Sequence, residues 1–385
     1  MKVQLERDVL ADAVQWAARS LPLRPSLPIL AGLHLSAADG QVTLSSFDYE
    51  TSARITINAV VDEPGVALVS GRLLAEISRT LPTQPVSLAT AGQTLELVCG
   101  KARFTLQLLP VTDYPELPAM PEASGRIGSA DLAQAVSQVV VAAGKDELLP
   151  VFTGIRVEFD HDQMSLLATD RYRMALKELT WAPLDRALTG AALVPGRVLS
   201  ETAKSMTSGD QVMVSLSGPG PGEGLIGFSG EGPSGTRQIT TRLLDGEFPK
   251  VRHLMDIPNE LTVRASTAEL LAAVKRVALV AERNTSLRMV IGQDAVTLEA
   301  ATGDQAQAFE TVAAVVDSVA DEPVLDQAGF NPHYLTDALS VLDAPYVHLT
   351  FSGPGKPCLL TALTELDGVP ASDYRHVIML MRLSS

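Results

Sequence analysis

The chain is poor in cysteine and contains no long apolar run. Its two cysteines, Cys99 and Cys358, stand far apart among 385 residues, which excludes a disulfide framework. Neither belongs to a CxxC motif or a cysteine–histidine cluster, so we expect no metal site and no cofactor. The apolar runs are too short for a membrane span, and charged residues interrupt the N-terminal segment where a signal peptide needs an apolar core. These features predict a cytoplasmic protein without a membrane partner.

Motifs of catalytic sites are missing as well. The sequence has no Gly-x-Ser-x-Gly elbow, and its six histidines are scattered without metal-ligand spacing. Gly353-Pro-Gly-Lys356 lacks the spacing and the hydroxyl residue of a phosphate-binding loop, and Asp160-His-Asp162 is typical of a hairpin turn. We therefore predict that the protein is not an enzyme. A hydrolase whose site is assembled from distant segments stays open as an alternative.

Acidic residues outnumber basic ones by 45 to 30, which gives a formal net charge of −15. This balance argues against nonspecific binding of polyanions to the surface as a whole. Apolar residues make up 46% of the chain, enough for a buried core in each of two or three domains. What an acidic chain of this kind binds depends on how its charges are distributed.

Three segments of the chain resemble one another. Each begins with a helix whose apolar residues recur at helical spacing, within residues 8–21, 132–143 and 270–281. An alternating β-hairpin follows each helix, and the first hairpin turns at Asp39-Gly40. The order predicts one structural unit repeated three times.

A second helix appears later in each segment. Residues 69–79 resemble residues 194–204, and residues 330–340 are a more divergent copy. More alternating strand closes each segment, so the fold class is α+β with mainly antiparallel sheets. Tyr114-Pro115 and Phe248-Pro249 end the first two segments, where boundaries usually fall. We predict domains at residues 1–120, 121–256 and 257–385.

The predicted helices are less acidic than the rest of the chain. Their combined charge is +6, counted over the windows 13–24, 71–81, 132–145, 196–208, 270–284 and 331–342. This pattern favours a shared positive surface that faces a phosphate backbone. The alternative that charge alone leaves open is an acidic three-repeat scaffold that binds proteins and never contacts DNA.

Several motifs together resemble one family. The repeated unit, Arg24-Pro-Ser-Leu-Pro-Ile-Leu30, Ala168-Thr-Asp-Arg-Tyr-Arg173, Phe248-Pro249 and the terminal Val377-Ile-Met-Leu-Met-Arg-Leu383 are similar to the bacterial DNA polymerase III β subunits, the sliding clamps. The resemblance covers nearly the whole chain, and its motifs occur in the family's order.

The resemblance implies a DNA clamp fold and a role in DNA replication. Two chains of three similar domains join head to tail as a ring, with antiparallel sheets outside and two helices per domain lining the hole. The ring encircles double-stranded DNA and acts as a processivity factor. The implied partners are a second copy of the chain, the α subunit of the replicative polymerase, the clamp loader, and other polymerases and repair proteins that bind through short peptides.

The resemblance also implies three sets of site residues. The DNA-binding residues are Arg24, Arg72, Lys145, Arg197 and Lys204. The dimer interface joins two domains through Ile77, Phe104, Leu106, Leu279 and Val280. The partner-peptide pocket is formed by Phe152, Thr169, Arg171, Tyr172, Arg173, Met174, Pro249, His253, Leu254, Met379, Leu380, Met381, Arg382 and Leu383.

Two pocket residues depart from the family pattern. Leu380 stands where the family usually has proline, and Phe152 stands where it has a smaller aliphatic residue. Both changes alter the shape of the pocket but keep it apolar. Neutral drift, with compensating changes elsewhere in the pocket, is one explanation of these two departures. A second hypothesis is that the pocket still takes partner peptides but rejects a competing inhibitor.

Overall fold

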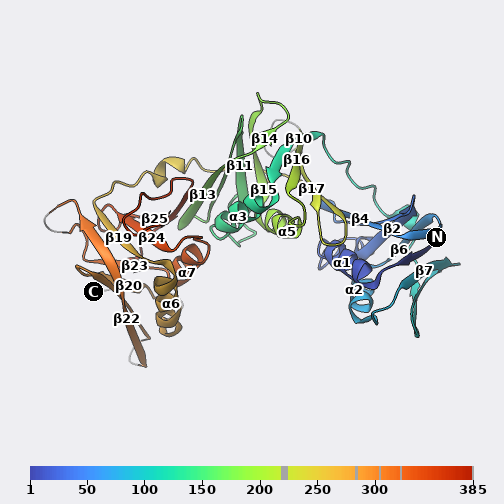
Figure 1. The fold of residues 1–385 in the computed structure, drawn as a ribbon, viewed down its shortest axis with the longest axis horizontal. Coiled ribbons are helices and arrows are strands. Elements are labelled where there is room, and N and C mark those ends of the chain that lie inside the picture. The colour runs from blue at the N-terminus through green and yellow to red at the C-terminus, as the bar shows by residue number, and fades with distance from the viewer. Residues whose placement is uncertain (218–223, 282–284, 303–304, 321–322, 384–385) are drawn as a thin grey trace. The chain divides into compact units, whose positions relative to one another are not determined.

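Figure 1 shows the computed structural model, which describes residues 1–217, 224–281, 285–302, 305–320 and 323–383. The chain divides into two compact units. Unit 1 comprises Met1–Ala133, Trp181–Leu188 and Glu201–Leu243, and unit 2 comprises Gln134–Thr180, Thr189–Ser200 and Leu244–Ser385. The strand ladders in the described part of the chain are antiparallel, so the predicted α+β class is confirmed.

The predicted amphipathic helices form, and their apolar stripes are buried. The described residues contain the α-helices α1 (Arg7–Ala18), α2 (Gly71–Thr80), α3 (Ser129–Val140), α4 (Pro150–Thr153), α5 (Gly196–Ser205), α6 (Thr267–Val277) and α7 (Pro332–Ser340). Leu10 and Val14 of α1 and Leu270 and Val274 of α6 are fully buried. The helical spacing therefore places these side chains in the cores, as expected. None of the described helices is long and apolar enough to cross a membrane.

Side-chain caps start two of these helices. The hydroxyl of Ser266 accepts a hydrogen bond from the backbone N–H of Glu269 at the start of α6. At the start of α7, the Asn331 side chain accepts hydrogen bonds from the backbone N–H groups of His333 and Tyr334, at 3.0 and 3.3 Å. Such caps satisfy backbone donors that have no partner inside the helix.

Unit 1 contains two sheets, with the strand orders β5-β1-β7-β8-β9 and β14-β10-β16-β17-β18-β4-β3-β2-β6. Their strands are β1 (Lys2–Leu5), β2 (Gly32–Ala38), β3 (Gln41–Phe47), β4 (Thr51–Asn58), β5 (Val60–Glu63), β6 (Gly65–Ser70), β7 (Val86–Ala91), β8 (Thr94–Cys99), β9 (Ala102–Gln107), β10 (Ala123–Gly128), β14 (Ala182–Pro183), β16 (Gln211–Ser217), β17 (Leu225–Glu231) and β18 (Thr236–Arg242). Helix α1 packs against α2, β3 and β4.

The first hairpin has the predicted turn. Ala38 pairs with Gln41, and the two residues between them, Asp39 and Gly40, have φ angles of 50° and 74°. Two positive φ angles are the requirement of a type I′ turn, which Asp-Gly meets at little cost. The local sequence thus sets the register of β2 against β3.

Unit 2 contains one sheet of the order β15-β11-β12-β13-β26-β25-β24-β19-β22-β21-β20-β23. Its strands are β11 (Gly154–Asp160), β12 (Gln163–Thr169), β13 (Arg173–Thr180), β15 (Thr189–Pro195), β19 (Leu261–Ser266), β20 (Leu287–Ile291), β21 (Ala295–Thr302), β22 (Ala306–Ser318), β23 (Gln327–Phe330), β24 (Tyr346–Phe351), β25 (Cys358–Leu363) and β26 (Tyr374–Ile378). Helices α6 and α7 pack against each other, as Figure 1 shows.

Sheets continue from one predicted repeat into the next. In unit 1, β18 of the middle repeat pairs with β4 of the first repeat. In unit 2, β13 of the middle repeat pairs with β26 of the last repeat. The strands of the middle repeat are therefore shared between the two units, and backbone hydrogen bonds connect it to each neighbour.

Candidate functional site

The five predicted DNA-binding side chains are all exposed. In unit 1, the guanidinium of Arg72 at the start of α2 donates a hydrogen bond to the carbonyl of Pro22, at 2.8 Å. This bond ties α2 to the loop that carries Arg24, so these two cations lie near each other. Arg197 and Lys204 are seven residues apart on α5, which places them on one face of the helix. Lys145 follows α3 instead of lying on it.

The helices themselves carry no net charge, whereas the predicted windows carry +6, because the windows do not coincide with the helix bounds. Within the α-helix bounds, seven basic residues are balanced by seven acidic ones. The predicted windows extended past the helix ends and counted Arg19, Arg24 and Lys145, which lie after α1 and α3. Residues 282–284 of one window lie outside the described residues. The helices are still much less acidic than a chain with net charge −15.

Four predicted pocket residues, Phe152, Arg171, Tyr172 and Arg173, line one cavity of about 680 Å³. We call it the α7 pocket, and its lining is Ala143, Gly144, Lys145, Asp146, Leu149, Phe152, Asp170, Arg171, Tyr172, Arg173, Asn331, His333, Tyr334 and Asp337. The lining comes from the segment after α3, from α4 and the residue before it, from the turn before β13 and from α7 with its N-cap Asn331. The α7 residues were missed in the sequence, although Asn331-Pro332 marked the start of that helix.

Cations and aromatic rings are stacked in the α7 pocket. The Arg171 guanidinium carbon lies 5.6 Å from the ring centre of Phe152 and 5.9 Å from that of Tyr172. The Arg173 guanidinium lies 4.3 Å from the ring centre of Tyr334. These distances are in the range of cation–π attraction. The pocket can therefore hold an apolar side chain against rings whose positions are fixed by charged neighbours.

The turn at Asp170 and Arg171 holds an uncommon backbone conformation. Arg171 has φ of 79°, a left-handed value that costs free energy for a residue with a side chain. The Thr169 hydroxyl accepts the Arg171 N–H at 3.1 Å and donates to the Arg173 carbonyl at 2.8 Å. One Asp170 carboxylate oxygen accepts the N–H groups of Tyr172 and Arg173, both at 3.0 Å. These bonds keep the turn in place at the mouth of the pocket.

Arg173 is a buried cation with two carboxylate partners. Its Nε donates to Asp170 at 3.0 Å and its Nη1 donates to Asp337 at 2.7 Å. A buried guanidinium needs such partners because desolvation of its charge is costly. Burial, together with the nearby Asp170 carboxylate, raises the pKa of Tyr334. The tyrosine therefore stays protonated and can donate a hydrogen bond to a ligand.

The C-terminal tail is hydrogen-bonded to the turn before β13 and to β23 of unit 2. The Met379 N–H donates to the Tyr172 carbonyl, and the Met381 N–H donates to the Gly329 carbonyl, both at 2.8 Å. Residues 380–383 line a second cavity of about 880 Å³ together with residues 323–329 and 354–355. Of the two departures from the family pattern, Phe152 thus lies in the α7 pocket and Leu380 in the tail cavity.

The remaining predicted pocket residues are not in the lining of either cavity. Met174 belongs to a buried cluster with Phe248 and Met255. His253 and Leu254 are exposed on the 3₁₀-helix η3 (Arg252–Met255). Pro249, which is half-buried, comes just before that helix and accepts the Val251 N–H at 2.9 Å.

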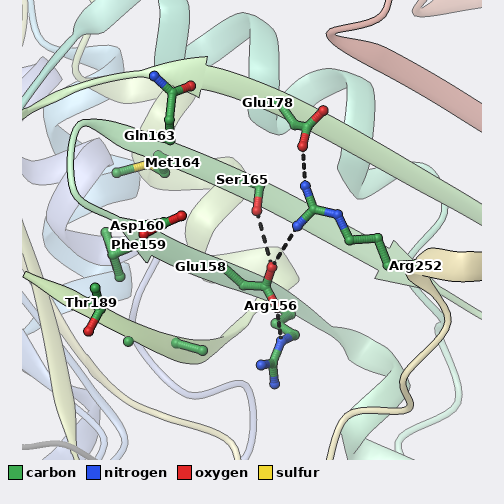
Figure 2. A pocket seen from close by; sticks show the side chains of 12 residues that line it. Arg156, Glu158, Phe159, Asp160, Gln163, Met164, Ser165, Glu178, Thr189 and Arg252 are labelled. Carbon is green, nitrogen blue, oxygen red and sulfur yellow. Dashed lines mark hydrogen bonds and ion pairs between the residues drawn. The ribbon is translucent and has the colours of Figure 1, made fainter.

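Ionic bonds attach η3 to the sheet. Figure 2 shows Arg252 between Glu158 and Glu178, in a third cavity of about 780 Å³. The Arg252 guanidinium donates to Glu158 at 3.0 Å and also to Glu178. Since Met255 is buried at the other end of the helix, both ends of η3 are held, and His253 and Leu254 point outward between them.

The predicted dimer residues differ in exposure. Ile77 and Leu106 are buried within unit 1, and Phe104 on β9 is half-buried. In unit 2, Leu279 is 84% exposed and Val280 is half-buried on the 3₁₀-helix η4 (Ala278–Val280).

Comparisons with known proteins define the class. Three family models match the chain: the N-terminal domain of the DNA polymerase III beta subunit at residues 1–118, the central domain at 126–250 and the C-terminal domain at 257–382. The solved sliding clamp of Bacillus subtilis matches the whole length of both chains with a TM-score of 0.87 at 22% identity. The sliding clamp of Pseudomonas aeruginosa bound to griselimycin matches equally fully, with a TM-score of 0.85 at 23% identity. The fold is a three-domain DNA clamp.

The chain belongs to the DNA polymerase III beta subunit family. It is 50% identical to the beta sliding clamp of Streptomyces coelicolor over 384 residues, which covers 100% of both chains. It is 38% identical to the beta sliding clamp homolog GriR of Streptomyces muensis, over 99% of both chains. The predicted family and clamp fold are confirmed, and the chain is a sliding clamp of DNA polymerase III.

Proposed function

We propose that two copies of this clamp join head to tail around double-stranded DNA and hold the replicative polymerase on its template. Each copy contributes three domains, at residues 1–120, 121–256 and 257–385. The protein works in the cytoplasm and catalyses no reaction itself; the chemistry belongs to the polymerase. Tethering by topology needs little affinity for DNA, which suits a chain whose helices are electrically neutral overall.

One observation is the main support for a head-to-tail ring: each copy has two different open sheet edges. β9 pairs with β8 alone, and residues 306–313 of β22 pair with β21 alone, within the described part of the chain. The first edge belongs to the first repeat and the second edge to the last repeat. Two unlike surfaces at opposite ends of a repeat series support heterologous association, which closes as a ring when the rotation allows.

The exposed cations supply weak contacts with the phosphates. Arg24 and Arg72 in unit 1, Arg197 and Lys204 on α5, and Lys145 after α3 are the side chains we assign to DNA. Long basic side chains that contact phosphates without reading bases leave the ring free to slide. Their contribution should weaken as salt concentration rises.

The α7 pocket and the tail form the proposed peptide-binding surface. It combines the exposed ring of Tyr172, the half-buried rings of Phe152 and Tyr334, the Met379 side chain and paired charges near the mouth, which fits an amphipathic peptide segment. Methionines adapt to several partner side chains, and this property suits a pocket that serves the polymerase α subunit, the clamp loader and repair proteins in turn.

Loading on circular DNA tests the ring. The clamp is loaded on nicked circles with a cognate clamp loader and ATP, and half of the sample is then linearised. We expect retention on circles and loss from linear DNA. Retention on linear DNA, or no loading by a competent loader, contradicts the proposal and favours the acidic scaffold without DNA or an enzyme.

Variants separate the specific DNA contacts from the effect of overall charge. An Arg24→Ala, Arg72→Ala double variant should load more slowly and lose salt sensitivity, because two phosphate contacts are removed. Arg186→Ala, an exposed arginine in the loop between β14 and β15, is the matched control. Equal effects of the two changes would assign the loss to overall charge.

A second candidate function concerns inhibitor rejection by the pocket. Similarity to GriR, and the existence of a griselimycin-bound clamp of the same fold, support the idea that Phe152 and Leu380 alter ligand choice. The affinities of griselimycin and of a partner peptide are compared for the wild type and for Phe152→Leu and Leu380→Pro, alone and combined. If the variants gain affinity for griselimycin but not for the peptide, the result supports inhibitor rejection by the wild-type pocket. An unchanged ratio of the two affinities contradicts that hypothesis.

A further inference from the structure

Each repeat carries a row of four residues that crosses four paired strands. Neighbouring members of a row lie directly opposite each other in adjacent strands, so their side chains share one face of the sheet. The rows are Leu68, His34, Ser45 and Arg54 in the first repeat, Leu193, Arg156, Leu167 and Leu176 in the middle repeat, and Gly329, Arg288, Glu299 and Phe309 in the last repeat. We call them the first, middle and last rows.

One backbone hydrogen bond shows that the three rows are equivalent. The segment that closes each repeat donates an N–H to the carbonyl of the first residue in the row, and all three bonds are 2.8 Å long. The donors are Leu109 for Leu68, Leu244 for Leu193 and Met381 for Gly329. Each closing segment therefore starts from the same place beside its own row.

An aromatic side chain of the closing segment covers the first and the middle row. Tyr114, five residues after the donor, stacks on His34, with 6.1 Å between ring centres and 18° between ring planes. Phe248, four residues after the donor, is buried in one cluster with the three leucines of the middle row. Proline follows both aromatic residues, as Pro115 and Pro249. An aromatic residue followed by proline is thus what this chain itself places on such a row.

The last row lines a cavity instead. Arg288, Glu299 and Phe309 are in the wall of a space of about 380 Å³, and Phe309 is 78% exposed. Leu383, two residues after the donor Met381, also lines this space, and none of the described residues after Met381 is aromatic. We call this cavity the last-row socket. It corresponds to the place that an aromatic ring fills in the other two repeats.

We propose that the last-row socket binds an aromatic side chain of a partner protein, presented by an extended segment in which proline follows the aromatic residue. The two covered rows of the same chain identify this occupant, since both take such a segment. The socket lies within one copy and does not depend on the proposed ring. Pairing along the open edge of β22 would use backbone groups and leave the face of the sheet accessible.

The side chains of the socket suit an aromatic ring better than an aliphatic group. Phe309 offers a ring for offset or edge-to-face packing. Nη1 of Arg288 lies 4.0 Å from the Glu299 carboxylate, which is too long for a hydrogen bond and leaves the cation able to lie over a ring. His34, at the same position of the first row, already stacks on a ring. An aliphatic occupant would lose both interactions.

A tethered segment tests the socket in the full-length chain. Residues 382–385 are replaced by Asp-Gly-Glu-Phe-Pro-Lys, the sequence that follows the donor of the middle repeat, which places phenylalanine four residues after Met381. Tethering gives the segment a high effective concentration. Phe309→Trp reports on the socket, and a tether with alanine in place of phenylalanine is the control. We expect the emission of the reporter to shift to shorter wavelength with the phenylalanine tether only. Equal emission with the two tethers overturns the socket.

A free peptide tests whether a separate protein can enter the socket. A fluorescein-labelled peptide of residues 243–252 is titrated with the clamp, and anisotropy gives the dissociation constant. We expect saturable binding that weakens at least about tenfold in the Phe248→Ala peptide. Phe309→Ala, which removes the ring of the socket, and Ala301→Phe, which fills its space, should each weaken binding about fivefold or more. Val319→Ala, at a side chain 74% exposed beyond β22, is the matched control.

The outcomes separate the socket from the proposed ring. Absence of saturable binding at any soluble concentration of peptide, or equal binding of the phenylalanine and alanine peptides, overturns the docking of a partner segment. Unchanged binding to both socket variants places the peptide elsewhere on the clamp and also overturns it. Sedimentation is run on the same samples. If the peptide converts dimers into monomers, a second copy competes for the socket, and the assignment to a partner protein is wrong. Monomers in the absence of peptide contradict the ring alone.

Discussion

His376 makes the stability of unit 2 depend on pH. Its side chain is fully buried, and its Nδ1 lies 2.9 Å from the Tyr374 hydroxyl oxygen. That hydroxyl donates to the Gln138 carbonyl at 3.1 Å, so the proton between Tyr374 and His376 must come from Nδ1. Nε2 is buried and has no hydrogen-bond partner among the described residues. Protonation would create a buried cation with an unpaired N–H.

Burial, with a smaller effect of the Arg173 charge, lowers the pKa of His376 from 6.5 to about 3. The folded state therefore binds fewer protons than the unfolded state between these two values. This contribution to stability is present above pH 6.5 and is lost as the pH falls through that window. Between pH 7 and pH 5 the loss is about 2 kcal/mol, from about 1.4 kcal/mol per pKa unit.

The assay compares the wild type with His376→Phe, which cannot titrate. Urea unfolding is followed by circular dichroism at pH 7 and pH 5. The variant loses a hydrogen bond, a cost of about 1 kcal/mol that is the same at both pH values. We expect the wild type to lose about 2 kcal/mol more than the variant on acidification. His253→Gln on exposed η3 should follow the wild type. Parallel losses for wild type and His376→Phe would refute the reasoning.

Three further changes test the pocket turn, the tail and the core. Asp170→Ala should lower the free energy of unfolding by about 3–5 kcal/mol, because it removes a carboxylate partner of the buried Arg173 guanidinium. Asp185→Ala, at an exposed turn, should lower it by only about 1 kcal/mol. Equal losses for the two variants would count against a buried ion pair. Gly329→Ala would put Cβ 2.7 Å from the Met381 carbonyl oxygen and so displace the tail. Carboxypeptidase should therefore trim the tail of this variant faster than that of Gly190→Ala, where the space around Cβ is open. Equal rates of trimming would mean that the tail contact is weak. Leu10→Ala should cost about 3–5 kcal/mol by calorimetry, and less than 1 kcal/mol would show that the core refills the cavity.

Much of the local structure was predictable. Apolar spacing found the helix that buries Leu10 and Val14, and Asp39-Gly40 set a two-residue turn. The resemblance to the DNA polymerase III β subunits implied the clamp fold, which the comparisons confirmed. The helix and the turn depend on residues within one or two turns of each other, so one stretch of sequence is sufficient to recognise them.

The charge counted for the helices changed once their ends were known. Periodicity does not mark the last residue of a helix, and Arg19 and Lys145 were counted as helical although they follow α1 and α3. The pocket was found only in part for a different reason. Tyr334 and Asp337 are far from Arg173 in sequence and meet it through tertiary packing alone.

The sequence by itself determined the repeats, the periodic helices, the hairpin turns and the family. Only the tertiary structure decided which distant strands pair, which cations are buried and which sheet edges stay open. The physical reason is that periodicity and turn chemistry act between near neighbours, whereas strand pairing and burial depend on residues brought together from separate repeats. Arg173 shows the difference: its motif was visible in the sequence, but its second carboxylate partner comes from α7.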